Sequence, residues 1–347
     1  MSPNIRAVLL ALVAFALFST HDVVVKFLGE SYSPFQIVFF SVLFGFPVAT
    51  ILLLRDETPG TLIPQHPWWV AARTVAAVVT GASAFYAFSV LPLAQTYAII
   101  FASPLLITLL SVPMLGEKVG LRRGLAVLVG LVGVLVVLRP GSTQLELGHL
   151  AALACAVSGA FASIVVRKIG REERSIVLIL YPLVANFMVM GALLPLVYVP
   201  MPVGHLGLFF AIAAMAMAAM LCLIAAYTHG EAAIVAPMQY SQILWAAAYG
   251  FVFFNELPQW NTALGAGIII ASGVYIVLRE SSMGDDTTAP VLRTRSRFDT
   301  GTVPRVSTMI RARGDVPPGS PEERPPATPR YQNKPKRPSM RGLPGRN

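Results

Sequence analysis

Charge is scarce in this chain of 347 residues: Asp, Glu, Lys and Arg make up 12% of it, whereas hydrophobic residues make up 55%. An average soluble domain carries about 25% charged residues. Because so apolar a chain cannot cover its surface with polar groups, the composition excludes an ordinary soluble protein. It favours a bilayer, where lipid accepts apolar side chains on every side of a helix.

Cysteine and cofactor motifs are equally scarce. The two cysteines, Cys155 and Cys222, both lie inside apolar runs, so we interpret them as small buried residues rather than a disulfide framework or a metal site. The chain contains neither a His-Glu-x-x-His motif nor a phosphate-binding Gly-x-x-x-x-Gly-Lys. We therefore expect no metal, no cofactor and no ATP-driven chemistry. The first apolar run is also too long for a cleavable signal peptide.

Long apolar runs dominate what remains. Ten runs approach the roughly 20 residues that a helix needs to cross hydrocarbon. They lack the polar alternation of barrel strands, and lipid leaves only helices or closed barrels as spanning structures. We therefore predict an all-α membrane protein with ten transmembrane helices. The runs are Ile5–Leu28, Pro34–Leu54, Trp69–Leu91, Thr96–Leu115, Arg123–Leu138, Gly148–Lys168, Ile176–Val199, His205–Tyr227, Ala232–Phe254 and Trp260–Leu278.

The basic residues predict an orientation. With the amino terminus in the cytoplasm, the outside receives only Lys26 and Arg139, while 24 Lys and Arg fall inside. Thirteen of these lie after residue 280, and without them the split is still 11 against 2. This asymmetry is typical of a cytoplasmic side. An even number of crossings then places both termini in the cytoplasm of a multi-pass protein in the inner membrane of the cell.

The chain also repeats itself. Residues 115–139 and 254–279 share one pattern: a Glu closes an apolar run, a polar turn follows, and a glycine-bearing helix ends in Val-Leu-Arg. The offset is 139 residues at Glu117 and Glu256, and five helices fit in one period. Because five is odd, the second copy must enter the membrane from the opposite face. We predict an inverted repeat, a feature of many secondary transporters, with repeats at 1–140 and 141–280.

The remaining residues, 281–347, form a basic tail. They hold 11 of the 27 prolines and 13 of the 26 Lys and Arg, with few apolar residues. We expect a disordered cytoplasmic segment, because too little apolar surface is available to offset the entropy of ordering. A solvated tail is favoured over one that contacts anionic lipid.

Polar residues inside apolar runs are costly, so each is a candidate for function. In the first run these are Ser19, His21, Asp22 and Lys26. One hypothesis is that His21 and Asp22 face a central cavity, where they contact substrate or carry a proton. The alternative, given equal weight, is that Lys26 reaches the outer interface and Asp22 merely pairs with it across one helical turn.

The ninth run is rich in polar residues after Pro237, which leaves a backbone carbonyl without its helical donor. Cavity lining is favoured over ordinary hydrogen bonding between helices, and aromatic rings there could stack on a planar or cationic solute. Tyr97 belongs to a related polar stretch in the first repeat, and Tyr86 is a single polar group for which a structural role is favoured. The substrate-binding candidates outside the first run are therefore Tyr86, Tyr97, Gln239, Tyr240, Gln242 and Trp245.

Two acidic residues stand at equivalent places in the repeats. Glu117 and Glu256 close the fourth and ninth runs, at opposite membrane faces. Their pairing suggests a role at an interface or a gate. We favour the simpler interpretation of solvated turn acids that cap the next helix.

These segments resemble a known family. The stretches SPLLITLLSVPMLGEKVGLRRGLAVLVGLVGVLVVLRP and AAIVAPMQYSQILWAAAYGFVFFNELPQWNTALGAGIIIASGVYIVLRE look like the two EamA repeats of the drug/metabolite transporter superfamily, and ALFSTHDVVVKFL resembles its opening helix. Tyr240 to Trp245 is similar to the branch that includes S-adenosylmethionine uptake proteins. One departure is Ser41, where many relatives have Arg. The resemblance implies a cofactor-free inner-membrane carrier of metabolites.

Together these features predict a transporter that moves a small polar metabolite, amino acid-like or S-adenosylmethionine-like, by alternating access driven by an ion gradient such as protons. The expected partners are this solute and the lipid bilayer, not nucleic acid; a homodimer is left open. Two alternatives are weaker. Gly81-Ala82-Ser83-Ala84 matches the Gly-x-Ser pattern of intramembrane serine proteases but needs a histidine partner, and a non-transporting scaffold would be expected to carry a folded soluble domain.

Overall fold

The computed structural model describes residues 3–54, 61–117, 119–139, 146–170, 172–230 and 232–282. Throughout these ranges the regular structure is helical, without a strand. They belong to the first of two compact units, residues 1–315, and the second unit, 316–347, lies outside the described residues. The predicted disordered tail, 281–347, falls outside them except for residues 281 and 282, which belong to the last helix.

The helices follow the predicted runs closely. Eight described segments are long and apolar enough to cross a membrane, and the fourth run, Leu93–Leu115, is one of them when taken across its break. The all-α prediction is confirmed. Two of the ten runs, the fourth and the ninth, are each broken into shorter helices. In chain order the elements are α1 (Pro3–Gly29), α2 (Pro34–Leu54), α3 (Pro67–Val90), α4 (Leu93–Ile100), α5 (Ser103–Leu115), α6 (Leu121–Leu138), α7 (Leu147–Ile169), α8 (Ser175–Val197), α9 (Val203–His229), α10 (Ala232–Val235), the 3-10 helix η1 (Ala236–Tyr240), α11 (Ser241–Phe254) and α12 (Trp260–Ser282).

The break between α4 and α5 has a local cause. Pro104 has no N–H, so the carbonyl of Ile100 loses its helical donor. The Ser103 hydroxyl donates to that carbonyl over 2.7 Å and replaces the missing bond. In the second repeat, the equivalent run is interrupted by η1, which contains Pro237. Broken helices leave polar backbone inside the bundle, which is tolerated where it is buried in protein or lines a cavity.

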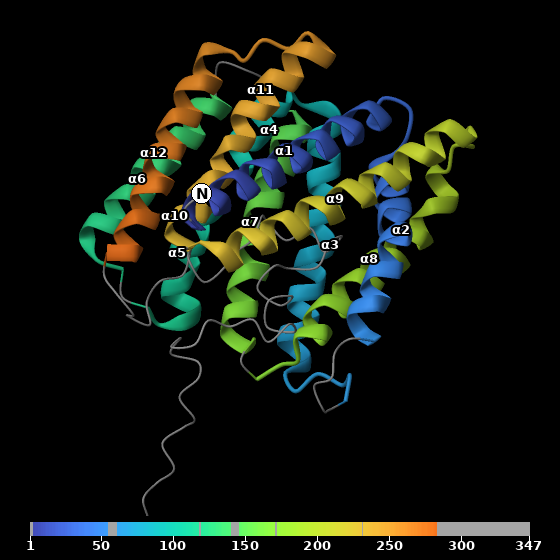
Figure 1. Cartoon of the computed structure of the whole chain (residues 1–347), viewed down its shortest axis with the longest axis horizontal. Coiled ribbons are helices and arrows are strands. Elements are labelled where there is room, and N and C mark those ends of the chain that lie inside the picture. The colour runs from blue at the N-terminus through green and yellow to red at the C-terminus, as the bar shows by residue number, and fades with distance from the viewer. Residues whose placement is uncertain are drawn as a thin grey trace, which may run out of the picture. The chain divides into compact units, whose positions relative to one another are not determined.

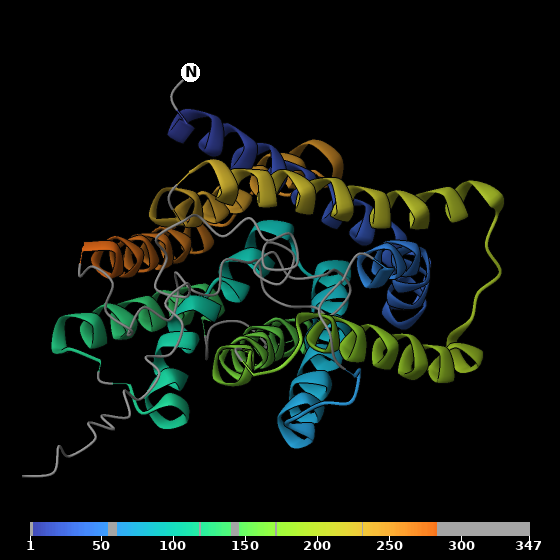
Figure 2. The same cartoon turned by 60° about the horizontal axis from the view of Figure 1, so that its bottom comes forward.

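The two repeats pack against each other through equivalent elements. Helix α1 lies along α9, and its counterpart α7 lies along α3. The pairs α2 with α8 and α6 with α12 each join a helix to its own equivalent (Figures 1 and 2). This exchange of neighbours is the arrangement expected of two inverted five-helix repeats, and it makes the interface between the repeats the natural place for a substrate path.

Helices α6 and α12 approach closely at a pair of glycines. A Cβ added to Gly265 would lie 2.6 Å from the carbonyl oxygen of Gly133, and one added to Gly133 would lie 3.0 Å from that of Gly265. Only residues without side chains allow two helix backbones to meet in this way. The contact fixes the register between the last helices of the two repeats.

Candidate functional site

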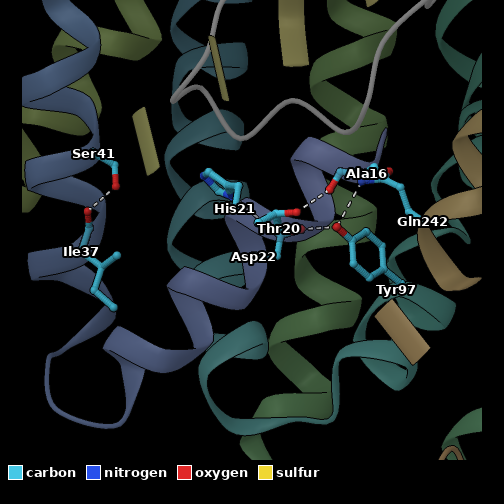
Figure 3. Close-up of polar contacts among 8 residues, drawn as sticks. All are labelled: Ala16, Thr20, His21, Asp22, Ile37, Ser41, Tyr97 and Gln242. Carbon is cyan, nitrogen blue, oxygen red and sulfur yellow. Dashed lines mark hydrogen bonds and ion pairs between the residues drawn. The ribbon is translucent and has the colours of Figure 1, made fainter. Parts of the chain in front are cut away.

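A buried polar cluster joins the two repeats. On α1, Asp22 is 1% exposed, and its Oδ1 lies 2.7 Å from Nδ1 of His21. The hydroxyl of Tyr97, on α4, donates to Oδ2 of Asp22 in a short hydrogen bond. The Gln242 amide, on α11, donates in turn to that hydroxyl over 3.1 Å. Figure 3 shows Asp22 between His21 and Tyr97, with Gln242 beyond Tyr97.

The cluster lies beside both helix breaks. Tyr97 precedes the turn that separates α4 from α5, and Gln242 is the second residue of α11, which begins where η1 ends. The breaks allow these side chains from α4 and α11 to converge on α1 from different repeats. The sequence placed Asp22, Tyr97 and Gln242 among the candidates separately, and the structure brings the three together.

The buried polar atoms that have no hydrogen-bond partner among the described residues include one on Gln242 itself and one on α1. These two are the carbonyl oxygen Oε1 of Gln242, whose residue is 0% exposed, and the hydroxyl of Ser19, which is 1% exposed. Nearly all buried polar groups in native proteins are satisfied by protein or by water. Both atoms can therefore accept a hydrogen bond from a bound molecule or a water.

Aromatic rings surround one side of the cluster. The Tyr97 ring lies 5.1 Å from that of Phe88 and 5.5 Å from that of Phe101, measured between centroids. Phe101 in turn meets Tyr240 edge to face at 5.4 Å. The predicted candidate Tyr240 thus joins the aromatic wall through its ring, and its 4% exposure places it in the core.

The other aromatic candidate, Trp245, reaches α1 indirectly. Its ring stacks on Tyr249 at 6.0 Å, and the hydroxyl of Tyr249 accepts a hydrogen bond from Thr20 over 3.3 Å. We did not predict Thr20 or Tyr249 from the sequence, although Tyr249 follows Trp245 by one helical turn. Gln239 on η1 and Tyr86 on α3 are half-buried, and neither has a hydrogen bond within the cluster.

Tertiary contacts hold Lys26 near the end of α1. It is 8% exposed, and its ammonium lies 2.8 Å from the Glu256 carboxylate. It also donates to the carbonyl of Leu91 over 2.6 Å. These contacts with Glu256 and Leu91, at the end of the bundle, belonged to neither of the two sequence hypotheses for Lys26.

Glu117, the equivalent acid of the first repeat, also forms an ion pair with a basic side chain. Glu117 pairs with Arg167 of α7, and each side chain is 11% exposed. Glu256 accepts a bond from the backbone N–H of Leu93, the first residue of α4. Our interpretation of these acids as solvated caps of the next helix is wrong: each carboxylate contacts a basic side chain of the other repeat.

Ser41, which the family resemblance singled out, lies on α2 away from this cluster (Figure 3). It is 5% exposed and its hydroxyl donates to the carbonyl of Ile37 over 2.7 Å (Figure 3). A backbone carbonyl one turn earlier thus satisfies the hydroxyl within its own helix. Nothing in this contact ties Ser41 to the Asp22 cluster.

The serine protease alternative lacks its geometry in the described residues. None of the hydrogen bonds made by the five histidines involves Ser83. Their side-chain partners are Asp22 for His21, Glu172 for His66, Gln95 for His149, Tyr32 for His205 and Thr228 for His229. A nucleophile needs a base within hydrogen-bond reach.

A small cavity opens at the Lys26 end of the bundle. Its volume is about 130 Å³, and its polar lining consists of Gln95, Glu256, Gln259 and Thr262. Gly250 and Ala247 of α11 complete one wall. The Glu256 carboxylate that pairs with Lys26 therefore also faces this cavity.

Comparison with known proteins agrees with this architecture. The EamA-like transporter family model matches residues 5–139 and again residues 146–279. The chain is 26% identical to an S-adenosylmethionine uptake transporter of Rickettsia bellii, over 76% of this chain and 90% of that protein. It is 28% identical to the pseudopaline exporter of Pseudomonas aeruginosa, over 78% and 95%. A riboflavin transporter of Vibrio cholerae is 27% identical, over 70% and 86%. With two matches that together span most of its length, this multi-pass membrane protein belongs to the EamA-like transporter family.

Proposed function

We propose that this chain carries a small polar metabolite with a cationic group across the inner membrane by alternating access, and that the Asp22 cluster binds that group. The observation that carries the proposal is a carboxylate with 1% exposure, placed where α1, α4 and α11 of the two repeats meet. An ionisable side chain within a membrane span is costly, and it persists where it serves a substrate or ion path.

The chemistry of the cluster favours a positively charged ligand. Asp22 supplies negative charge, while Ser19 and the Oε1 of Gln242 supply acceptors without a protein donor. The Tyr97 and Phe101 rings offer faces that attract cations. An amino acid ammonium or the sulfonium of S-adenosylmethionine fits this set, in agreement with the relative named as an S-adenosylmethionine uptake transporter.

The relatives differ in both solute and direction. One is named for uptake, one for export, and a third for riboflavin. At about 26–28% identity these names define a panel of solutes to test rather than one substrate. Import and export must therefore be measured separately.

We also propose that protons drive the transport. His21 and Asp22 share a hydrogen bond of 2.7 Å inside the bundle. Such a pair can hold or release a proton as the site changes its exposure. The positive-inside pattern supports an orientation with both termini in the cytoplasm.

Solute counterflow in proteoliposomes tests this function. The panel contains S-adenosylmethionine, cationic and neutral amino acids, and riboflavin, each with and without a pH gradient. We expect a cationic solute to exchange, and Asp22→Asn to lower its rate at least tenfold because the isosteric amide removes the charge. Glu30→Gln is the matched control, since Glu30 is an exposed acid close to the end of the same helix. Full activity of Asp22→Asn would refute the assigned site.

A further inference from the structure

Two ion pairs cross between the repeats in a reciprocal manner. Glu256 of the second repeat pairs with Lys26 of the first, and Glu117 of the first pairs with Arg167 of the second. The acids are equivalent at an offset of 139 residues. The bases are equivalent at 141, the offset between the starts of the two family matches at residues 5 and 146. The two pairs are thus copies of one contact, each built from opposite halves of the chain.

The backbone around the two acids is also equivalent. Gly116 and Asn255 both end their helices with positive φ, at 69° and 54°. The next N–H then turns back onto its own helix, from Glu117 to the carbonyl of Ser111 and from Glu256 to that of Gly250. This left-handed cap reverses the chain and directs each acid toward the other repeat.

The two pairs lie at opposite ends of the bundle. Lys26 donates to the carbonyl of Leu91, and a Cβ added to Gly148 at the start of α7 would lie 2.8 Å from the Leu91 side chain. Arg167 lies 19 residues further along α7, a rise of about 28 Å at 1.5 Å per residue. The two ion pairs therefore lie at opposite ends of α7.

We propose that Lys26–Glu256 and Glu117–Arg167 are two alternating latches, each of which ties the repeats together at one end while the other end opens. This inference rests on the alternating-access part of the proposed function. Lys26 follows Asp22 by four residues, so the first latch lies one helical turn from the substrate site. The cavity that Glu256 lines lies at the same end.

The contacts indicate which residue of the first latch matters most. Glu256 contacts the ammonium of Lys26 and the backbone N–H of Leu93, and the carbonyl of Leu91 holds Lys26 in place. These three partners all belong to the first repeat. The second repeat contributes one residue to this network, Glu256, and it contributes a charged side chain. Glu256→Gln removes the charge but keeps an oxygen for the Leu93 N–H, so the change isolates the ion pair.

Cysteine accessibility tests the latches without knowledge of the substrate. The background carries Cys155→Ala and Cys222→Ala. Ala247→Cys reports on the cavity beside Glu256. Thr108→Cys, at the equivalent position of the first repeat, reports on the other end and is 0% exposed in this state. Each reporter is labelled with a membrane-impermeant maleimide, from the outside of right-side-out vesicles and from the exposed face of inverted vesicles.

We expect Glu256→Gln to raise the labelling rate at position 247 about tenfold and to lower it at position 108, because weakening one latch shifts the population toward the state that opens that end. Glu117→Gln should do the reverse. Lys26→Gln must reproduce Glu256→Gln, and the two changes combined should add little to either alone. Glu30→Gln and Glu172→Gln, both exposed acids, serve as controls.

Changes of the same sign at both reporters, or none at either, would overturn the latches, since loosening of the fold raises both rates and a passive pair alters neither. The proposed function fails separately. Reciprocal labelling with no transport of any solute in the panel would leave the latches standing. If Asp22→Asn abolished transport but the labelling rates at positions 247 and 108 did not change in opposite directions, the latches would be refuted and the proposed function would stand.

Discussion

Tyr97 and Asp22, 75 residues apart in the chain, form a hydrogen bond in which the phenol donates to the buried carboxylate. The same phenol oxygen accepts from Gln242, so a single hydroxyl links α1, α4 and α11. Because Gln242 belongs to the second repeat and the other two residues to the first, this hydroxyl connects the repeats at the proposed substrate site. A substrate cation at Asp22 would compete with this bond, which gives binding a direct means to alter contact between the repeats.

Tyr97→Phe tests that connection. The change removes one oxygen and leaves both an Asp22 oxygen and the Gln242 amide without this partner in a buried site. Each unsatisfied group costs about 1–3 kcal/mol. We expect a lower melting temperature in detergent and a transport rate reduced about tenfold or more, with the apparent affinity for a cationic solute changed.

Tyr86→Phe provides the control, since it removes the same atom from a half-buried tyrosine outside the cluster. It should leave both stability and transport close to those of the unchanged protein. Equal effects of the two variants would contradict a specific role for Tyr97.

Orientation in the membrane is a second prediction. Glu30 follows the end of α1 next to the Lys26 latch, and Glu172 follows α7 at the Arg167 end. With the positive-inside pattern of 11 basic residues against 2 before the tail, Glu30→Cys should react with an impermeant maleimide in intact cells. Glu172→Cys should react only after the membrane is permeabilised. The reverse pattern would invert the assigned orientation.

The fold could be predicted from the sequence because each spanning helix can be recognised from its own residues. A run such as residues 205–227 shows its length and apolarity without reference to any other segment, and the odd number of helices per repeat fixes the inversion. The broken fourth and ninth segments were only partly evident. Pro104 and Pro237 mark them, but proline alone does not reveal whether a helix bends, breaks or continues with one bond missing.

The site was harder to predict because its contacts are not local. Asp22 and Lys26, four residues apart, suggested a pair on one helix face, yet Lys26 contacts Glu256, 230 residues away. The offset between Glu117 and Glu256 was visible in the sequence, but their basic partners come from the opposite repeat. Only the packing of α1 and α7 against the other half shows that the pairs cross.

A third prediction concerns the break before α5. Ser103→Ala removes the hydroxyl that replaces the helical donor lost at Pro104 and leaves the buried Ile100 carbonyl without it. We expect a loss of about 1–2 kcal/mol in stability, measured as a lower melting temperature. Thr108→Val is the control, because the carbonyl of Pro104 to which Thr108 donates lies in a continuous helix. If Thr108→Val were the more damaging change, the role assigned to Ser103 would be wrong.

The last prediction tests the packing of Tyr240 against α12. A Cβ added to Gly273 would lie 1.7 Å from the Tyr240 hydroxyl oxygen and 2.6 Å from the carbon that bears it. No rotamer of a methyl group avoids such an overlap, so Gly273→Ala must displace the Tyr240 ring or the helix. Overpacking of this kind costs about 1–3 kcal/mol, and we expect a clear fall in melting temperature together with reduced transport.

Gly267→Ala is the matched control on the same helix, because a Cβ there meets nothing within 4 Å. That change should be neutral or slightly stabilising, as alanine favours helix more than glycine does. Adding Tyr240→Phe to Gly273→Ala removes the nearer of the two clashing atoms and should restore part of the stability. If Gly273→Ala alone behaved like Gly267→Ala, the ring of Tyr240 could not lie where it forms the aromatic wall with Phe101, and its place beside the Asp22 cluster would have to be revised.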